Sequence, residues 1–209
     1  MGARKRKPKT PAHHRPLPCV IVAVDPGRRS GWATLVEGRP VSWGTLDAGD
    51  VESIERVLRA ACELAERADL PLVIIGEEWN VGGNRGMRQW QGLGAAWGSW
   101  QFAAERLSAE GRAERTCTRR IVADRIRRVS TSTWRAEYGI CRRPKGAPDD
   151  WHKTQAVRLV GERLKIDAVL LQHDAAEALL IGAWAAHAHA VSKKLPKLVM
   201  RRWQGAGAP

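Results

Sequence analysis

Acidic residues follow the two most apolar segments of this 209-residue chain. The run Cys19-Val-Ile-Val-Ala-Val24 ends in Asp25-Pro-Gly, and Leu72-Val-Ile-Ile75 is followed by Glu77 and Glu78. Taken singly, an Asp before Pro-Gly is most often a turn former. Continuous apolar runs of this length are typical of strands buried on both faces, and an acid at the tip of such a strand is a candidate for chemistry.

A further acidic pair occurs in His173-Asp174-Ala-Ala-Glu177, where a helix is predicted over about residues 172–190. Residues three apart on a helix have Cβ atoms about 5–6 Å from one another, so Asp174 and Glu177 share a face. Acids in a first helical turn commonly just complement the helix dipole. The four acids together instead suggest a cluster that converges from two strands and one helix.

Such a cluster needs cations, because two carboxylates 4 Å apart repel by about 4 kcal/mol at an effective dielectric near 20. All-oxygen ligands favour Mg²⁺ or Mn²⁺ over zinc. Two metal ions about 3.5–4 Å apart on carboxylates are a common device for in-line phosphoryl transfer. The sequence therefore predicts a phosphoryl-transfer centre, with purely structural acids as the alternative.

The elements that position these acids form an α/β pattern. Strands are predicted at residues 31–36 and 41–46, joined by a hairpin turn at residues 37–40. Asp50 is the expected N-cap of the helix that follows. Three strands, a helix and a further strand are typical of a mixed sheet with a crossover helix.

The second half of the chain is predicted to be mostly helical. A helix over about residues 89–107 contains Gly92, Gly94 and Gly98, and each glycine costs about 1 kcal/mol relative to Ala. Either another helix or subunit packs closely there, or the helix breaks. A short strand at 126–129, a loop at 141–150 and a helix at 151–164 precede the last helix.

Charge is concentrated at the two ends of the chain. The net charge is +13, yet residues 1–18 hold six bases and residues 192–209 hold five, with no acid in either segment. Basic arms suit DNA or RNA through counterion release, although they also keep a chain soluble. We predict a basic flexible arm (1–18), one domain (19–191) and a basic C-terminal tail (192–209).

Several protein classes are excluded by composition. No apolar run approaches the length of a membrane span, and the basic first 18 residues lack the apolar stretch of a secretory leader. The four cysteines lie far apart with no Cys-x-x-Cys, which argues against a disulfide framework or a zinc knuckle. The expected location is a reducing cytoplasm, with no membrane partner.

The acidic motifs, in this order, resemble those of RuvC-type Holliday junction resolvases in the RNase H-like superfamily. The matching segments are Val-Asp25-Pro-Gly-x-x-x-Gly31-Trp-Ala, the glutamate after Leu-Val-Ile-Ile, Leu93 to Ala104, Trp151-His-Lys153-Thr-Gln and His-Asp174-Ala-Ala-Glu177-Ala-Leu. The likeness covers roughly residues 19–190. It implies an RNase H-like mixed five-stranded sheet flanked by helices, so residues 19–191 are expected to be the nuclease domain.

The resemblance also assigns roles to individual residues. Asp25, Glu77, Asp174 and Glu177 correspond to the metal-binding acids, expected to hold two Mg²⁺ ions per site, with Mn²⁺ able to substitute. Glu77 is preferred over Glu78 because it comes first after the strand, and both stay open. Glu177 stands where the familiar bacterial resolvases carry Asp. Lys153 resembles the lysine that reaches the scissile phosphate or the attacking water.

Three further residues are expected to bind DNA. Trp79 is the nearest aromatic to the position where the family stacks a ring on bases, although core packing is nearly as good an interpretation. Arg119 and Arg120 lie in an arginine-rich stretch.

The function implied is that of a metal-dependent, structure-selective endonuclease. It would cut Holliday junctions or other branched DNA by paired symmetric nicks in recombination and repair, as a homodimer whose interface is the glycine-containing helix. The alternatives are an RNase H-like nuclease for RNA or other branched DNA, and a non-catalytic nucleic-acid-binding protein. The expected location is nucleoid-associated, or the host cytoplasm if the basic arms mark a phage-type enzyme.

Overall fold

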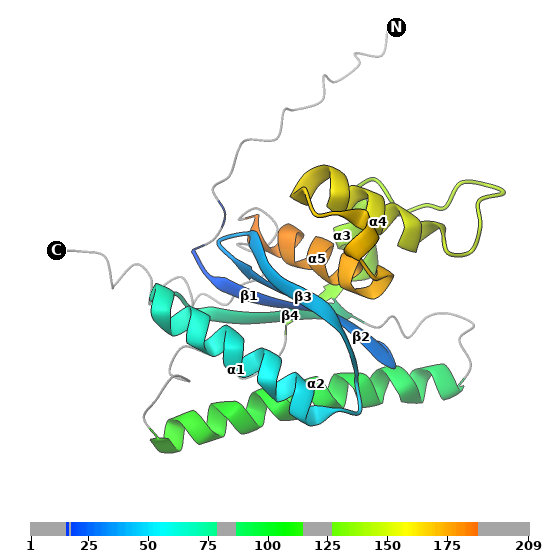
Figure 1. Ribbon diagram of the computed structural model, residues 1–209. Helices are drawn as coiled ribbons and strands as arrows, with labels where there is room; N and C mark the ends of the chain where they lie inside the picture. The colour runs from blue at the N-terminus through cyan, green and yellow to red at the C-terminus, as the bar shows by residue number, and fades with distance from the viewer. Residues whose placement is uncertain (1–15, 17, 79–86, 115–126, 188–209) are drawn as a thin grey trace, which may run out of the picture.

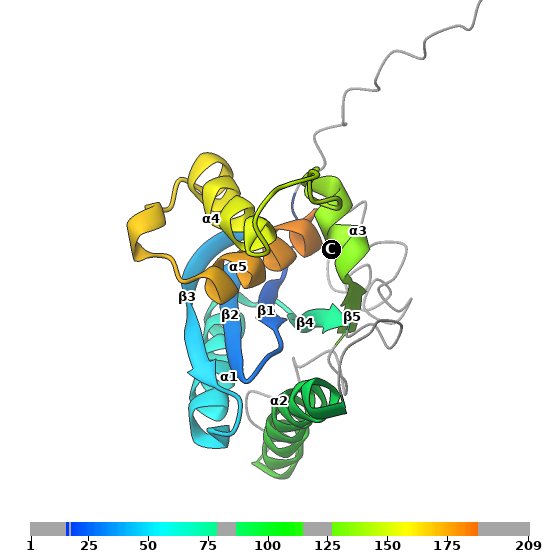
Figure 2. The same ribbon diagram turned by 90° about the vertical axis from the view of Figure 1, so that its right-hand side faces the viewer.

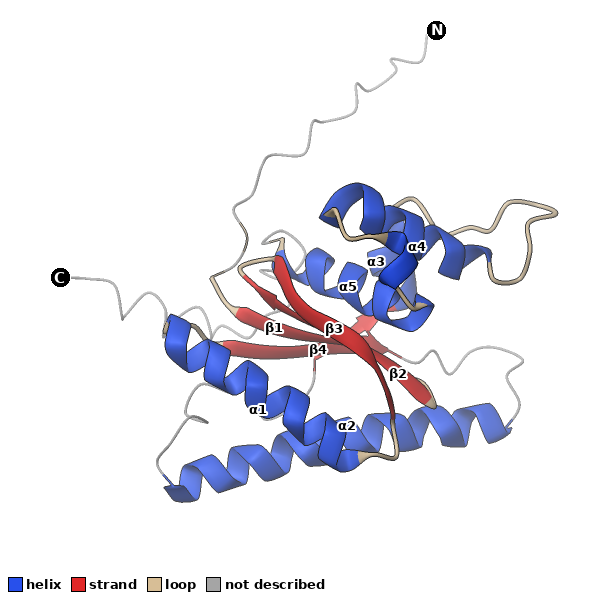
Figure 3. Cartoon of the chain, viewed as in Figure 1, coloured by secondary structure: helices blue, strands red, loops and turns tan. Residues whose placement is uncertain are grey.

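A five-stranded mixed sheet forms the centre of the molecule. The computed structural model describes residues 16, 18–78, 87–114 and 127–187. The sheet order is β3-β2-β1-β4-β5, with the first three strands antiparallel and with β4 and β5 parallel to β1 (Figure 3). The strands are β1 (Val20–Asp25), β2 (Arg29–Val36), β3 (Arg39–Asp47), β4 (Leu72–Glu78) and β5 (Arg127–Ser130). The predicted strands and hairpin are confirmed, each within a few residues of its expected bounds.

Helices cover both faces of the sheet, which explains the continuous apolar run of β1 (Figures 1 and 2). Val20, Val22 and Val24 pack on one face with α1 (Val51–Ala68) and α2 (Met87–Glu114). Ile21 and Ala23 pack on the opposite face, because side chains alternate along a strand. The helices there are α3 (Thr131–Glu137), α4 (Trp151–Leu164) and α5 (His173–Ala186), with a 3₁₀ turn at Ala168–Leu170.

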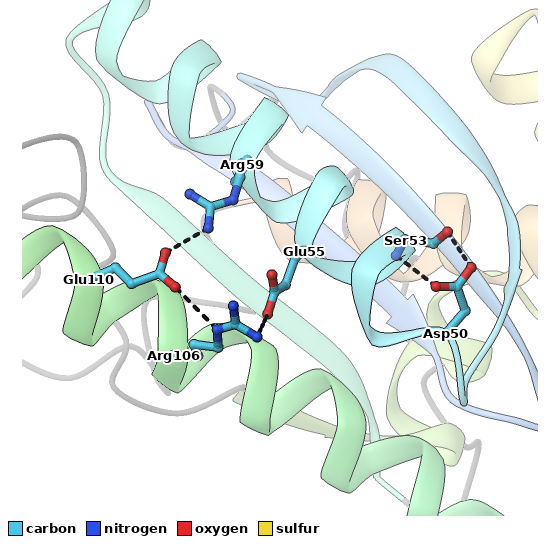
Figure 4. A network of polar contacts seen from close by, with 6 residues as sticks. All are labelled: Asp50, Ser53, Glu55, Arg59, Arg106 and Glu110. Atoms are coloured by element: carbon cyan, nitrogen blue, oxygen red, sulfur yellow. Dashed lines mark hydrogen bonds and ion pairs between the residues drawn. The ribbon is translucent and has the colours of Figure 1, made fainter.

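Ion pairs among partly exposed residues and the buried Glu55 join α1 to α2 (Figure 4). Arg106 lies 3.1 Å from Glu55 of α1 and 3.1 Å from Glu110 of its own helix, and Arg59 pairs with Glu110 at 2.6 Å. Exposed pairs contribute at most about 1 kcal/mol each. The buried face of α2, which includes Trp97 and Trp100, carries most of the packing.

The first of these helices is capped as its sequence predicts. The Asp50 carboxylate accepts a 3.0 Å hydrogen bond from the Ser53 backbone N–H, which marks the start of α1 (Figure 4).

The long helix α2 runs unbroken through its three glycines, so the proposed helix break is wrong. It extends beyond the predicted 89–107 at both ends. A Cβ added at Gly92 or Gly98 would meet no atom within 4 Å. No contact within the described chain therefore accounts for these two glycines, and close packing by a second subunit stays a prediction.

The last helix, α5, is buried on all sides rather than along one stripe. Every residue from 175 to 186 is buried. At Gly182 an added Cβ would lie 2.3 Å from Leu35 Cδ1, so the helix approaches β2 closely. The helix ends at Ala186 rather than near 190; His187 pairs with Pro16 in an isolated bridge, and 188–190 lie outside the described residues.

Other predictions have mixed outcomes. The helix at 151–164 is confirmed, but the short helix α3 was not predicted. No helix among the described residues is long and apolar enough to cross a membrane. Apart from residues 16 and 18, both predicted basic arms lie outside the described part of the chain, as do Trp79, Arg119 and Arg120.

Candidate active site

The strand register brings Asp25 and Glu77 to one edge of the sheet. Strands β1 and β4 are parallel, with Val24 opposite Gly76, so each strand's next residue is an acid. Because side chains alternate along a strand, Asp25 and Glu77 lie on the face of the sheet that packs against α5. Glu78 comes one residue later, so it lies on the opposite face, where it is exposed. The geometry therefore favours Glu77 over Glu78 as the partner of Asp25.

Helix α5 supplies the other two acids from its N-terminal turns. Asp25, Asp174 and Glu177 each offer a carboxylate oxygen, and these atoms all lie within 4.8 Å of one another. The close approach depends on Gly31, because a Cβ there would lie 1.9 Å from the Asp174 carbonyl oxygen. Glycine in the Asp25-to-Gly31 motif thus lets α5 lie directly against β2.

The unpredicted helix α3 fixes the orientation of Glu77. Its Oε1 accepts a 2.5 Å hydrogen bond from the Thr131 hydroxyl, and its Oε2 accepts a 2.9 Å bond from Trp134 Nε1. A buried carboxylate is costly unless its oxygens are hydrogen-bonded. Thr131 and Trp134 therefore hold Glu77 in place from a neighbouring element.

Two cations pair with the acids of α5. Lys153, on the first turn of α4, donates to Asp174 Oδ1 at 3.1 Å, and Arg135 of α3 donates to Glu177 Oε1 at 2.6 Å. Sequence reasoning singled out Lys153 but missed Arg135, because seven residues are too few to show helical periodicity. The Ser/Thr run at residues 130–133, a typical helix start, was the available signal.

The electrostatics of the site follow from crowding acids in a buried place. Burial raises the pKa of Asp25 well above its ordinary value, and Glu177, Glu77 and Asp174 raise it further, against the lowering effect of Arg135. Burial also raises the pKa of Glu77 despite its hydrogen bond from Thr131. Burial lowers the pKa of Lys153, but the hydrogen bond to Asp174 and the charge of Asp174 outweigh this effect and raise the pKa. The ionised carboxylates thus repel one another, and a cation bound among them would relieve this repulsion.

All four acids open into one cleft of about 450 Å³. Its other walls include Arg28, in the turn after β1, Arg29 at the start of β2, and Leu93 of α2. Arg29 Nε donates to Thr45 Oγ1 at 3.0 Å, which holds this side chain beside the cleft. Arginine guanidinium groups recognise phosphate well, so the rim is suited to a phosphate-bearing ligand.

The donor set fits a hard divalent cation. Every candidate ligand atom is a carboxylate oxygen, and no His or Cys belongs to this cluster among the described residues. Oxygen-only sites suit Mg²⁺ and Mn²⁺. Glu77 lines the same cleft but is bound by α3, so it stands slightly apart from the three mutually close acids.

No protein-family model matches the sequence, and no curated protein matches it. Among solved structures, the chain is similar to T. thermophilus RuvC in complex with Holliday junction substrate, at 16% identity and a TM-score of 0.53, over 83% of this chain and 97% of that chain. The yeast mitochondrial Holliday junction resolvase Ydc2 matches at 10% identity and a TM-score of 0.45, over 91% and 87%. The first likeness shows that the chain has the RuvC-type, RNase H-like fold.

Proposed function

We propose that this protein is a metal-dependent, structure-selective endonuclease that cleaves Holliday junctions and related branched DNA. The observation that carries the proposal is the convergence of four carboxylates and Lys153 on one cleft of a RuvC-type fold. T. thermophilus RuvC, to which this chain is similar, was solved in complex with Holliday junction substrate, which supports a four-way junction as the substrate class. Arg28 and Arg29 at the cleft rim, whose guanidinium groups are suited to phosphate, support a nucleic-acid substrate as well.

In this proposal, Asp25, Glu77, Asp174 and Glu177 hold two Mg²⁺ ions, for which Mn²⁺ can substitute. Bound cations of this kind activate water and stabilise the charge that develops on the phosphate and its leaving oxygen. Thr131 and Trp134 keep Glu77 oriented. Lys153, which is half-exposed and lines the cleft, would contact the scissile phosphate or the attacking water.

Cutting a junction by paired symmetric nicks requires two such sites. A two-fold symmetric homodimer would present one cleft to each of two strands. The open glycine positions of α2 make this helix the candidate interface.

The decisive experiment is a cleavage assay with labelled four-way junction, duplex, RNA:DNA hybrid and single strands, each with Mg²⁺ or with EDTA. We expect paired 5′-phosphate nicks in the junction with Mg²⁺ and none with EDTA. Preferred cleavage of the hybrid would indicate an RNase H-like activity instead. Junction binding without any cleavage would indicate a non-catalytic binding protein.

A further inference from the structure

Arg135 of α3 lines the candidate active-site cleft but is mostly buried. Only 19% of its side chain is exposed, and its Nη2 lies 2.6 Å from Glu177 Oε1. The guanidinium lies over the Trp134 ring, 5.1 Å from the centroid. Its Nε is buried, and no acceptor within the described chain bonds to it. Glu177 is the carboxylate that forms an ion pair with Arg135 among the described residues, while Asp25 and Glu77 lie close enough to interact with its charge.

Lys153 differs from Arg135 in a way that matters for metal binding. Half of the Lys153 side chain is exposed, so its ammonium can leave Asp174 and be solvated by water. Arg135 lies on α3, which packs against α5 (Figure 2), and only 19% of its side chain is exposed where it lines the cleft. A mostly buried guanidinium that loses its ion-pair partner loses much of the compensation of its charge, which is unfavourable.

Glu177 also belongs to the group of three acids whose oxygens could share one cation. Its side chain is only 6% exposed, so it has little room to serve both partners through water. Two positive charges competing for one buried carboxylate repel each other through a medium that screens them poorly.

We propose that Arg135 and a divalent cation are alternative partners of Glu177. Without metal, Arg135 keeps Glu177 ionised and in place; when a cation binds, Arg135 gives up that contact. The inference rests on the proposed metal site and adds that Arg135 competes with the metal ion for Glu177. Since coupling between two binding events is reciprocal, removing Arg135 must both destabilise the metal-free protein and tighten metal binding.

The test uses the full chain without DNA. Wild type, Arg135→Lys, Arg135→Gln and the control Arg158→Gln are compared by thermal melts in EDTA and by calorimetric titration with Mn²⁺. Arg158 forms an ion pair with Glu162 on the exposed side of α4, 52% and 53% exposed, so its loss controls for net charge. We expect Arg135→Gln to melt lowest in EDTA, yet to bind Mn²⁺ at least about fivefold more tightly than wild type.

The conservative variant keeps the test informative if Arg135→Gln does not fold in EDTA. Lysine retains the charge but lacks the planar fork, so Arg135→Lys should bind Mn²⁺ with an affinity between wild type and Arg135→Gln. Arg158→Gln should match wild type in both measurements.

Two results would overturn the inference, and only the second would also reject the proposed metal site. Unchanged or weaker Mn²⁺ binding by both Arg135 variants, with wild-type binding intact, would show that Arg135 does not compete and would leave the metal site standing. Absence of Mn²⁺ binding by the wild type would reject the metal site and the proposed function together.

Discussion

The acids of the cluster lie close together in a partly buried place, where Lys153 and Arg135 offset only part of their charge. Asp25, Asp174 and Glu177 bring carboxylate oxygens within 4.8 Å of one another, and Glu177 is buried. Stability alone would favour replacing such residues with neutral ones. Acids that are retained at this cost are candidates for function, and single substitutions distinguish a catalytic from a structural role.

Asp174→Asn preserves the shape of the side chain and removes the charge that would hold metal. We expect single-turnover junction cleavage to fall at least about 100-fold, since a metal contributes several kcal/mol to transition-state stabilisation. The melting temperature should stay close to that of wild type. Asp149→Asn, in the loop before α4, is the matched control because its side chain is 99% exposed. Near-normal cleavage by Asp174→Asn would reject the nuclease site.

Glu77→Gln and Glu78→Gln separate the two adjacent glutamates. Glu77 follows the alternation of β4 that faces α5 and is bound by Thr131 and Trp134, whereas Glu78 is exposed. We expect Glu77→Gln to abolish cleavage and Glu78→Gln to reduce it only slightly, as measured on the same junction with saturating Mg²⁺. The reverse ranking would assign the second acid to Glu78.

The raised pKa of Asp25 predicts a pH-dependent stability. Folded Asp25 keeps its proton above the ordinary pKa of 3.8, so its contribution to stability is present at low pH and is lost as pH rises through the folded pKa. In EDTA, Asp25→Asn should therefore melt higher than wild type at pH 8 and equal to it near pH 4. About 1 kcal/mol corresponds to about 2–4 °C for a chain of this size. A difference in melting temperature between Asp25→Asn and wild type that does not change with pH would contradict the explanation by a buried charge.

Among the elements, the contact between β2 and α5 positions the site most directly. Gly31 is required because the Asp174 backbone occupies the space that a Cβ would need, at 1.9 Å. The helix that carries two of the acids therefore depends on a residue that does no chemistry itself.

Gly31→Ala should push α5 away from β2 and lower both stability and cleavage. Overpacking of this kind costs about 1–3 kcal/mol, measured by denaturant unfolding. Gly161→Ala is the control: this glycine lies within α4, where an added Cβ would make an ordinary 3.5 Å contact with Ile166 O. It should stabilise the helix by about 0.5–1 kcal/mol. If the two substitutions changed the free energy of unfolding equally, the contact between β2 and α5 would have room for a side chain at residue 31.

For the whole molecule, assembly determines how many clefts meet one substrate. Figure 1 shows α2 on the outer side of the layer it shares with α1, where a second copy could approach it. Phe102, on the same helix, is 56% exposed. Exposed apolar side chains next to open glycines are compatible with a helix–helix interface between subunits.

Replacing Gly92 and Gly98 with leucine tests this interface. Because an added Cβ at either position meets nothing within 4 Å in the single chain, the monomer fold should tolerate larger side chains there. We expect sedimentation to show monomers and junction cleavage to lose its paired nicks, while the melting transition of the monomer persists. An unchanged dimer with full activity would place the interface elsewhere.

The sequence by itself determined the α/β class, most elements and the four acids, because strand alternation, helix periodicity and capping are local properties. Tertiary structure decided which side chains meet. Arg135 and Glu177 are 42 residues apart, and Thr131 and Glu77 are 54 apart, so no local pattern could pair them. The face on which Glu77 lies likewise depends on strand register, and the burial that raises the pKa of Asp25 depends on α5 packing over the sheet.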